Sequence, residues 1–204
     1  MTRALPANRV SRDPFALPRG AAGRLAGMVM ACSNERAQEA VAERLAVGPG
    51  ERVLEIGYGP GRLIRRLLET TPAARVAGVD PSGVMLLQAG KQTRRYARTG
   101  RLELRLGVAE NIPWPDASFE RAVTVNTAEV LADVDACLAE MRRVLVRGGT
   151  ALLASHSPTA PGRLQRARAL SQPVLDDLVA RAEQAFGCVT CEDLGPVVAL
   201  VARR

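Results

Sequence analysis

The sequence predicts an α/β fold, a doubly wound and mostly parallel seven-stranded sheet with an antiparallel last strand, helices on both faces and an N-terminal helical arm. Short apolar runs alternate with helical patterns from residue 52 onward, and such alternation requires right-handed crossovers between parallel strands. A glycine-rich turn follows the first run, at the kind of strand-to-helix junction where these sheets bind ligands. The length of 204 residues suits one domain with its own core.

The N-terminal part, residues 1–47, is expected to form an arm and helices that cover the ligand site. Residues 48–204 are expected to form the main domain, and the two parts together make one globular unit. A first helical stretch has an apolar face formed by Leu25, Met28 and Val29. A second helix is predicted after Asn34, a favoured N-cap residue, and ends at Gly48-Pro49-Gly50.

Seven short runs are predicted to be strands because they are apolar or alternate with a period of two. They cover residues 52–56, 75–79, 101–106, 119–125, 150–154, 188–194 and 197–202. Gly195-Pro196 joins the last two runs closely, which predicts an antiparallel hairpin at one edge of the sheet.

Helices are predicted between the strands, where apolar residues recur at helical spacing. Asp80-Pro81 is expected to open one of them, with an acidic N-cap and proline at the first helical position. Gly148-Gly149 is expected to end another, whose apolar face is formed by Val134, Cys137, Leu138, Met141 and Leu145. Two further helices are expected. One runs from about residue 62 to 69, and the other has its apolar face between residues 174 and 182 and is stopped by Gly187.

The charge balance is unusual, because the net charge is +7 and Lys91 is the only lysine among 28 basic residues. The remaining 27 are arginines spread along the chain, with no block longer than a dipeptide. A nucleic-acid footprint is usually clustered, and single-strand binders add stacking aromatics, whereas aromatics make only 3% of this chain. We therefore interpret the arginines as surface chemistry and do not expect a nucleic-acid partner.

The sequence favours a cytoplasmic location. No apolar run approaches the ~20 residues that a membrane-spanning helix needs, and the first ten residues lack the apolar core of a secretory signal. The four cysteines should then be reduced. Cys188 and Cys191 fall in a predicted strand at an odd spacing that points them to opposite faces, so no metal site is expected there. A monomer or homodimer without a membrane span is expected.

The glycine turn narrows the choice of ligand. Glu55 ends the first strand, and glycine then recurs at every second position as Gly57, Gly59 and Gly61. A dinucleotide fingerprint would need a further glycine where Arg62 stands, and no P-loop pattern is present. A carboxylate before the turn would repel a pyrophosphate, so Glu55 suits a ligand with a cationic ammonium or sulfonium end.

A second acidic residue, Asp80, ends the second strand. A carboxylate at this place in a doubly wound sheet can accept hydrogen bonds from both hydroxyls of a ribose, although Asp80 alone could also be a helix N-cap. Glu55 and Asp80 together describe a nucleoside with a cationic amino-acid tail. S-adenosylmethionine (SAM) fits that description.

Four stretches, in order, resemble the motifs of class I SAM-dependent methyltransferases of the small-molecule type, which includes ubiquinone and menaquinone methylases. Residues 55–61 resemble the E/D-x-G-x-G-x-G motif, and residues 79–82 resemble the acidic second-strand motif. Residues 107–119 resemble G-D-A-E-x-L-P-F-x-D-x-S-F-D, and residues 143–149 resemble R-V-L-x-P-G-G. The resemblance implies a Rossmann-like fold, SAM as cofactor, S-adenosylhomocysteine (SAH) as product and no metal.

The resemblance also implies a set of cofactor-binding residues: Glu55, Gly57, Tyr58, Gly59, Gly61, Asp80, Pro81, Ser82, Met85, Val108, Ala109, Glu110 and Asn126. Val108 departs from the family, which often has an aspartate there that reaches the adenine amino group. The adenine edge must then rely on backbone near Ala109, on Glu110 or on water. The Tyr58 ring either covers the methionine part of the cofactor or faces the substrate, or it simply packs in the loop.

Candidate catalytic groups follow the fourth and fifth strands. His156, the only histidine, follows the fifth strand at the edge where substrates bind, and its ordinary pKa suits a general base. Glu129 is a second candidate base, and Asn126 is expected near the point of methyl transfer. Each could instead be a solvated loop or turn residue. A dedicated base is optional, because alignment of the acceptor can supply ~7–11 kcal/mol.

The sequence therefore predicts an enzyme that transfers a methyl group from SAM to a small-molecule acceptor by in-line displacement. A SAM-fold protein that binds SAM without methylating, as a regulatory partner or a cyclase, is an alternative because fold does not fix function. An RNA or protein methyltransferase is less favoured, because residues 125–128 lack the N-P-P-[FY] arrangement of base-amine methylases. The N-terminal arm and residues 155–172 are expected to cover the substrate.

Overall fold

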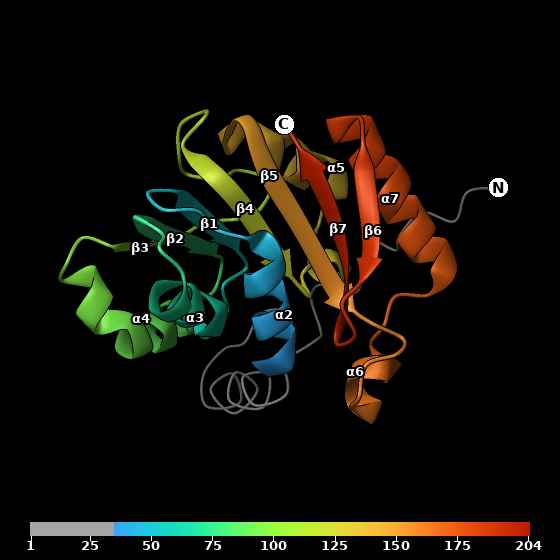
Figure 1. The fold of residues 1–204 in the computed structure, drawn as a ribbon, viewed down its shortest axis with the longest axis horizontal. Coiled ribbons are helices and arrows are strands. Elements are labelled where there is room, and N and C mark those ends of the chain that lie inside the picture. Colours follow the sequence, from blue (N-terminus) through green and yellow to red (C-terminus); the bar gives the residue numbers. More distant parts are fainter. Residues whose placement is uncertain (1–34) are drawn as a thin grey trace.

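The computed structural model describes residues 35–204, which form one seven-stranded sheet with helices on both faces (Figure 1). The strand order is β3-β2-β1-β4-β5-β7-β6. The first five strands pair in parallel, and β7 runs antiparallel to both β5 and β6. The strands are β1 Arg52–Ile56, β2 Arg75–Asp80, β3 Leu102–Leu106, β4 Phe119–Val125, β5 Leu145–His156, β6 Val189–Asp193 and β7 Val197–Arg203. The predicted fold class and the edge hairpin of β6 and β7 are confirmed.

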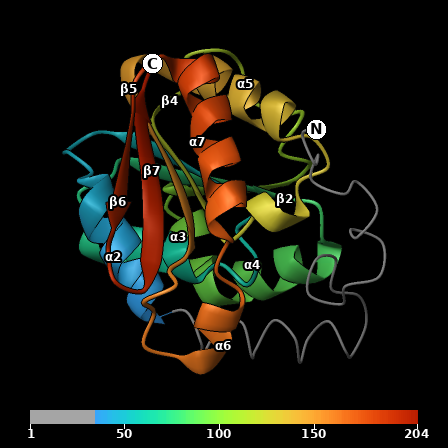
Figure 2. The same ribbon diagram turned by 90° about the vertical axis from the view of Figure 1, so that its right-hand side faces the viewer.

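The helices divide between the two faces of the sheet. Helices α2, α3 and α4 cover one face, and α5 and α7 cover the other, as Figure 2 shows along the sheet edge. Their bounds are α2 Glu35–Leu45, α3 Arg62–Thr70, α4 Gly83–Ala97, α5 Val134–Val144, α6 Arg163–Ala167 and α7 Gln172–Phe186, with a 3-10 turn, η1, over Ala128–Val130. The short elements η1 and α6 were not predicted, because three and five residues carry too little periodicity to be recognised.

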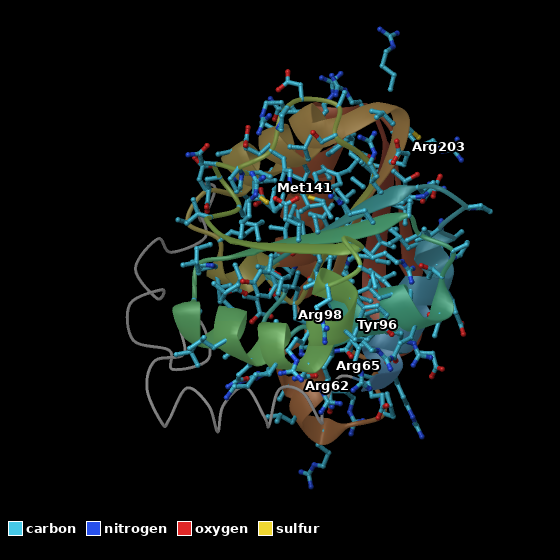
Figure 3. The ribbon with its side chains drawn as sticks, turned by 90° about the vertical axis from the view of Figure 1, so that its left-hand side faces the viewer. Arg62, Arg65, Tyr96, Arg98, Met141 and Arg203 are labelled. Carbon is cyan, nitrogen blue, oxygen red and sulfur yellow. The ribbon has the colours of Figure 1, made fainter. Side chains whose placement is uncertain are left out.

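Each face of the sheet buries its own apolar core, because side chains of central strands alternate between the faces. Val53 lies in the core under α3, and its neighbour Leu54 lies in the core under α5. Figure 3 shows Met141 of α5 on one side of the sheet and Tyr96 of α4 on the other. The predicted apolar face of α5 is confirmed, since Met141 and Cys137 are fully buried.

Helix α2 belongs to the same core as the central sheet. Val41 and Leu45 are buried on its inner face, and the helix packs on α3, β5 and β7. On its outer face the Arg44 guanidinium donates to both carboxylate oxygens of Glu192 in β6, at 2.6 and 2.7 Å. The predicted arm and first helix, and the predicted N-cap Asn34, lie outside the described residues.

Two predicted helix ends are wrong. Asp80 does not cap α4, because its backbone still pairs with Leu106 as the last residue of β2. Ser82 is the N-cap instead, and its hydroxyl accepts a hydrogen bond from the Met85 N–H at 3.4 Å. Asp80-Pro81 and Ser82 all match cap preferences, so local sequence alone could not choose between them.

Gly148-Gly149 does not end α5. The helix ends at Val144, and Leu145 already pairs with Phe119 as the first residue of β5. The register of β5 then shifts before Thr150, and Gly148 takes a positive φ of 79° in the intervening bulge. The glycines therefore serve the strand rather than the helix, since positive φ favours glycine.

Candidate cofactor site

The candidate site lies at the carboxyl ends of β1, β2 and β4, where the strand order reverses between β1 and β4. Loops of doubly wound sheets diverge at such a switch point and leave room for a ligand. The loop after β1 is tied to β2, since the Gly57 N–H donates to the Val79 carbonyl at 2.8 Å. The loop after β4 is tied to β5, since the Asn126 N–H donates to the Ala154 carbonyl at 2.7 Å.

The glycine loop after β1 takes a backbone path that side chains would disturb. Gly57, Gly59 and Gly61 all have positive φ, of 74°, 50° and 82°. A Cβ on Gly61 would lie 2.7 Å from the Cβ of Ala89, so this glycine lets α3 approach α4 closely. A Cβ on Gly59 would meet nothing within 4 Å. The backbone at Gly59 therefore borders open space, as a cofactor cradle requires.

Glu55 places a buried carboxylate next to this loop. Its side chain is 4% exposed and accepts a hydrogen bond from the Ile64 N–H in the first turn of α3. Its Oε2 atom is buried and has no hydrogen-bond partner within residues 35–204. Burial raises the pKa of Glu55 well above its ordinary value, and the nearby Asp80 raises it further. A carboxylate in this state gains by receiving a cation.

Asp80 is held by the backbone of two loops. Its Oδ2 accepts from the Gly59 N–H at 2.9 Å, and its Oδ1 accepts from the Ser82 N–H at 2.8 Å. Burial raises the pKa of Asp80, and the two N–H donors oppose that rise. Each carboxylate oxygen has two lone pairs, so both can accept a further hydrogen bond. The link from Asp80 to Gly59 was not predicted, because residues 21 positions apart in sequence show no local signal.

The Tyr58 ring packs in the core, which is the loop-packing alternative for this residue. It is 2% exposed, and its ring lies so close to β2 that a Cβ on Gly78 would be 2.7 Å from it. Its hydroxyl is 3.5 Å from the Arg105 carbonyl. Met85 is also buried, in the first turn of α4, while Pro81 is exposed beside the buried Ser82. Tyr58 can therefore contribute its backbone, and not its ring, to the cofactor cradle.

The loop after β3 carries the residues predicted to face adenine. Val108 is 45% exposed, whereas Ala109 is buried. Glu110 Oε1 accepts from the N–H groups of Ala132 and Asp133, at 3.0 and 3.2 Å. Glu110 thus links this loop to the start of α5, a role that sequence reasoning missed. The side chain of Val108 is exposed and can cover an adenine face.

Arg143 of α5 fixes the same loop. Its guanidinium donates to the carbonyl oxygens of Trp114 and Ile112, each at 2.9 Å, and to Glu140 Oε2 at 2.8 Å. Glu140 in turn accepts from the Ile112 N–H at 2.7 Å. The hydrogen bonds that Arg143 donates to carboxylates, Glu140 first and then Asp116, raise the pKa of Arg143. Two motifs that sequence analysis treated separately, around residues 107–119 and 143–149, are therefore one physical unit.

Beyond the cofactor loops, two strand ends carry polar groups without partners. Asn126, at the end of β4, has a φ of +56°, and neither its amide oxygen nor its amide nitrogen has a partner in the described part of the chain. His156 ends the neighbouring β5, is 7% exposed, and its buried Nδ1 atom likewise lacks a partner there. Burial lowers the pKa of His156, and the Arg168 cation lowers it further. Glu129 is exposed on η1.

The match to known families agrees with this geometry. Residues 53–149 match the model of a methyltransferase domain. The chain carries a class I SAM-dependent methyltransferase domain. The matched span runs from β1 through the glycine loop, Asp80 and the adenine-side loop to the bulge in β5, so it contains all the predicted cofactor-binding residues.

Known relatives include methyltransferases of quinone metabolism. The chain is 24% identical over 156 residues to the uncharacterized methyltransferase YdaC of Bacillus subtilis, with 76% of this chain and 84% of the relative covered. It is 31% identical over 145 residues to a 2-phytyl-1,4-naphtoquinone methyltransferase of Synechococcus elongatus, with 70% and 60% covered. It is 37% identical over 125 residues to the demethylmenaquinone methyltransferase of Deinococcus radiodurans, with 60% and 50% covered. The chain thus spans half to three fifths of the quinone enzymes.

Solved structures share the fold. A protein of Methanococcus maripaludis assigned as an S-adenosyl-L-methionine-dependent methyltransferase superposes with a TM-score of 0.74 at 17% identity, covering 89% of each chain. The phosphoethanolamine N-methyltransferase 2 of Haemonchus contortus, in complex with SAH, gives a TM-score of 0.64 at 21% identity, covering 78% of this chain and 38% of that one. No helix within residues 35–204 is long and apolar enough to span a membrane.

Proposed function

We propose that this protein transfers the methyl group of SAM to a small-molecule acceptor at the carboxyl edge of β1, β2, β4 and β5. The observation that carries the proposal is the buried Glu55 carboxylate, whose Oε2 has no partner within the described residues, beside Asp80 and the open Gly59 backbone. A cationic amino-acid tail would pair with the buried Glu55 carboxylate, and the hydroxyls of a ribose would bind Asp80. The donor set therefore fits SAM.

In this proposal, different residues bind the methionine part, the ribose and the adenine of the cofactor. Glu55 and the backbone of the glycine loop hold the methionine part, and Asp80 binds the ribose hydroxyls. Met85, Val108 and Ala109 border the adenine. When bound, SAM supplies a methyl carbon activated by its positively charged sulfur. The protein contributes by fixing the acceptor in line with that carbon, which can supply ~7–11 kcal/mol.

In the transfer step a lone pair of the acceptor forms a bond to the methyl carbon while the carbon–sulfur bond breaks. The electron pair of the broken bond stays on sulfur, which gives SAH, and an acceptor that carried a proton loses it. The Asn126 amide can orient the acceptor, because it offers both a donor and an acceptor without partners in residues 35–204. The lowered pKa of His156 keeps its imidazole neutral at pH 7, so it can take the proton. Glu129 remains the second candidate base.

The segment after β5 supports the expected role of residues 155–172 as a cover over the acceptor. Ser157 and Thr159 donate to Asp193 Oδ2 at 3.2 and 2.8 Å, which ties the segment to the β6–β7 hairpin. We expect the protein in the cytoplasm, where its four cysteines would be reduced. A monomer or homodimer acting on a small molecule completes the proposal.

Two measurements test this function. Calorimetric titrations should show binding of both SAM and SAH, and no binding of either by folded protein would refute the proposal. Incubation with methyl-tritiated SAM and separate small-molecule, RNA and protein fractions of a cell extract should place the label in the small-molecule fraction. Label in RNA or protein would favour those substrates, and binding without any transfer would favour a regulatory protein or a cyclase.

A further inference from the structure

The segment between β5 and α7 is strongly basic. Residues 157–172 contain Arg163, Arg166 and Arg168 and no aspartate or glutamate. The cofactor half of the site is acidic by contrast, since Glu55 and Asp80 lie there. The two halves of the site therefore offer charges of opposite sign, and a cationic cofactor accounts for only one of them.

This basic segment is held in place by its own hydrogen bonds. Asp193 of the β6–β7 hairpin accepts from Ser157 and Thr159 through Oδ2, and from the Gly195 N–H at 2.9 Å through Oδ1. Arg166 donates from Nη1 to the carbonyl oxygens at positions 160 and 161, at 2.7 and 3.0 Å. Helix α6 consequently stays close to the end of β5, where Figures 1 and 2 both show it.

His156 lies at the end of β5, where the basic segment of residues 157–172 adjoins the site. It is the last residue of β5 and is 7% exposed, and its Nδ1 atom has no partner within residues 35–204. Arg168 follows α6 as its C-cap, and its positive charge adds to burial in lowering the pKa of this imidazole. Buried polar atoms are nearly always hydrogen-bonded, so a molecule that brings an acceptor or a donor to Nδ1 would complete the local structure. Asn126, on the neighbouring strand end, presents a second group that needs partners.

From this arrangement, and resting on the proposed function, we propose that the methyl acceptor carries an anionic oxygen group, a carboxylate or a phosphate, that binds between Arg168 and His156. Guanidinium groups bind both anions through paired hydrogen bonds, which makes arginine the favoured residue for the purpose. Arg163, five residues earlier, adds to the positive potential that would attract such a molecule. The anion thereby orients the acceptor, with its reactive atom toward Asn126. In this arrangement His156 contacts the anion, so Glu129 is the candidate base left to take a proton from the reacting atom.

Small probes test the inference on SAH-saturated full-length protein. Calorimetry would compare hexanoate and hexyl phosphate with hexanamide, which has the same chain but no charge. We expect at least one anionic probe to bind ten times more tightly than hexanamide or better. Arg168→Gln should abolish that preference, and Arg168→Lys should keep part of it. Arg142→Gln removes an exposed charge on α5 and should leave probe binding unchanged.

The controls separate this inference from the proposed function. SAH affinity and melting temperature are measured for every variant, so that loss of folding is recognised, and Arg163→Gln serves as the second variant if Arg168→Gln does not fold. Equal binding of hexanamide and the anions, no probe binding, or full retention of the preference in Arg168→Gln would overturn the inference while SAH binding stands. If the wild type does not bind SAH, the proposed function itself is refuted. Salt-sensitive binding of a single-stranded RNA, without binding of either small anion, would overturn the inference in favour of nucleic acid.

Discussion

At the scale of single residues, the buried side-chain atoms that lack partners identify the site. Within residues 35–204 they are Glu55 Oε2, both amide atoms of Asn126, His156 Nδ1 and Arg62 Nε. Glu55, Asn126 and His156 lie at or just beyond the ends of β1, β4 and β5, which are neighbours in the sheet. Because such atoms are rare in folded proteins, their concentration at one edge is best explained by ligands that satisfy them.

The role of Asp80 gives the first prediction. Asp80→Ala should weaken SAM binding at least tenfold, which corresponds to about 1.4 kcal/mol, because it removes the proposed ribose contacts and frees the Gly59 and Ser82 N–H groups. Calorimetry with SAM measures the change. Asp176→Ala, at an exposed carboxylate on α7, is the matched control and should bind SAM like the wild type. Unchanged affinity in Asp80→Ala would show that the ribose lies elsewhere.

Gly61 gives a second prediction at this scale, on stability. Gly61→Ala should destabilise the protein by about 2–5 kcal/mol, because it adds overpacking of 1–3 kcal/mol to a left-handed backbone strain of 1–2 kcal/mol. The Cβ would lie 2.7 Å from Ala89 at a φ of +82°. Gly90→Ala is the control, since a Cβ there meets nothing within 4 Å inside α4 and should stabilise by about 0.5–1 kcal/mol. Urea unfolding measures both, and equal effects would refute the packing argument.

At the scale of elements, sequence patterns predicted regular structure well and long-range contacts poorly. The central strands were predictable because strands buried on both faces are continuous apolar runs, as residues 76–79 of β2 and 151–154 of β5 show. The N-cap of α4 could not be predicted, because Asp80 and Ser82 are both favoured cap residues. Only the pairing of Asp80 with β3 shows that it belongs to the sheet. In the site, Glu55 and Asp80 were found from their strand ends, whereas the partners of Glu110 and Arg143 depend on the tertiary fold.

The Arg143 clamp gives the element-scale prediction. Arg143→Met should loosen the loop between β3 and β4, since the Ile112 and Trp114 carbonyl oxygens lose their donor. The side chain is 30% exposed, so we expect a loss of about 1–3 kcal/mol in the free energy of unfolding. Amide hydrogen exchange should accelerate at residues 108–118 in particular. Arg142→Met, next along α5 and exposed, is the control, and equal exchange in both variants would contradict the clamp.

At the scale of the whole molecule, the arginines of the described chain join elements that are distant in sequence. Arg44 links α2 to β6, Arg52 of β1 binds Glu120 of β4 through two nitrogens, and Arg121 binds Glu51 in the same way. Arginine suits this use because its planar fork matches a carboxylate. Much of the unusual basic composition is thus accounted for by structure, and the acid-free segment of residues 157–172 stands out against that background.

The pH dependence of folding gives the last prediction, at this same scale. The pKa of Glu55 in the folded, cofactor-free protein is raised well above its ordinary value of 4.5. Between these two pKa values the folded state holds a proton that the unfolded state has released. Stability must therefore fall as pH rises through this interval, by up to about 1.4 kcal/mol per pH unit for one proton. Asp80, with a raised pKa, acts in the same direction, whereas His156, with a lowered pKa, acts in the opposite one.

Comparison with Glu55→Gln isolates the contribution of this one group, because glutamine resembles the protonated carboxyl and does not titrate. Urea unfolding from pH 5 to 8 should show wild-type stability falling relative to the variant as pH rises, and parallel curves would contradict the prediction. Saturating SAM should reduce the fall in the wild type, because a cation beside Glu55 favours its ionised form. SAM binding should then release a proton in this range, measurable as a buffer-dependent heat, and that release should be absent from Glu55→Gln.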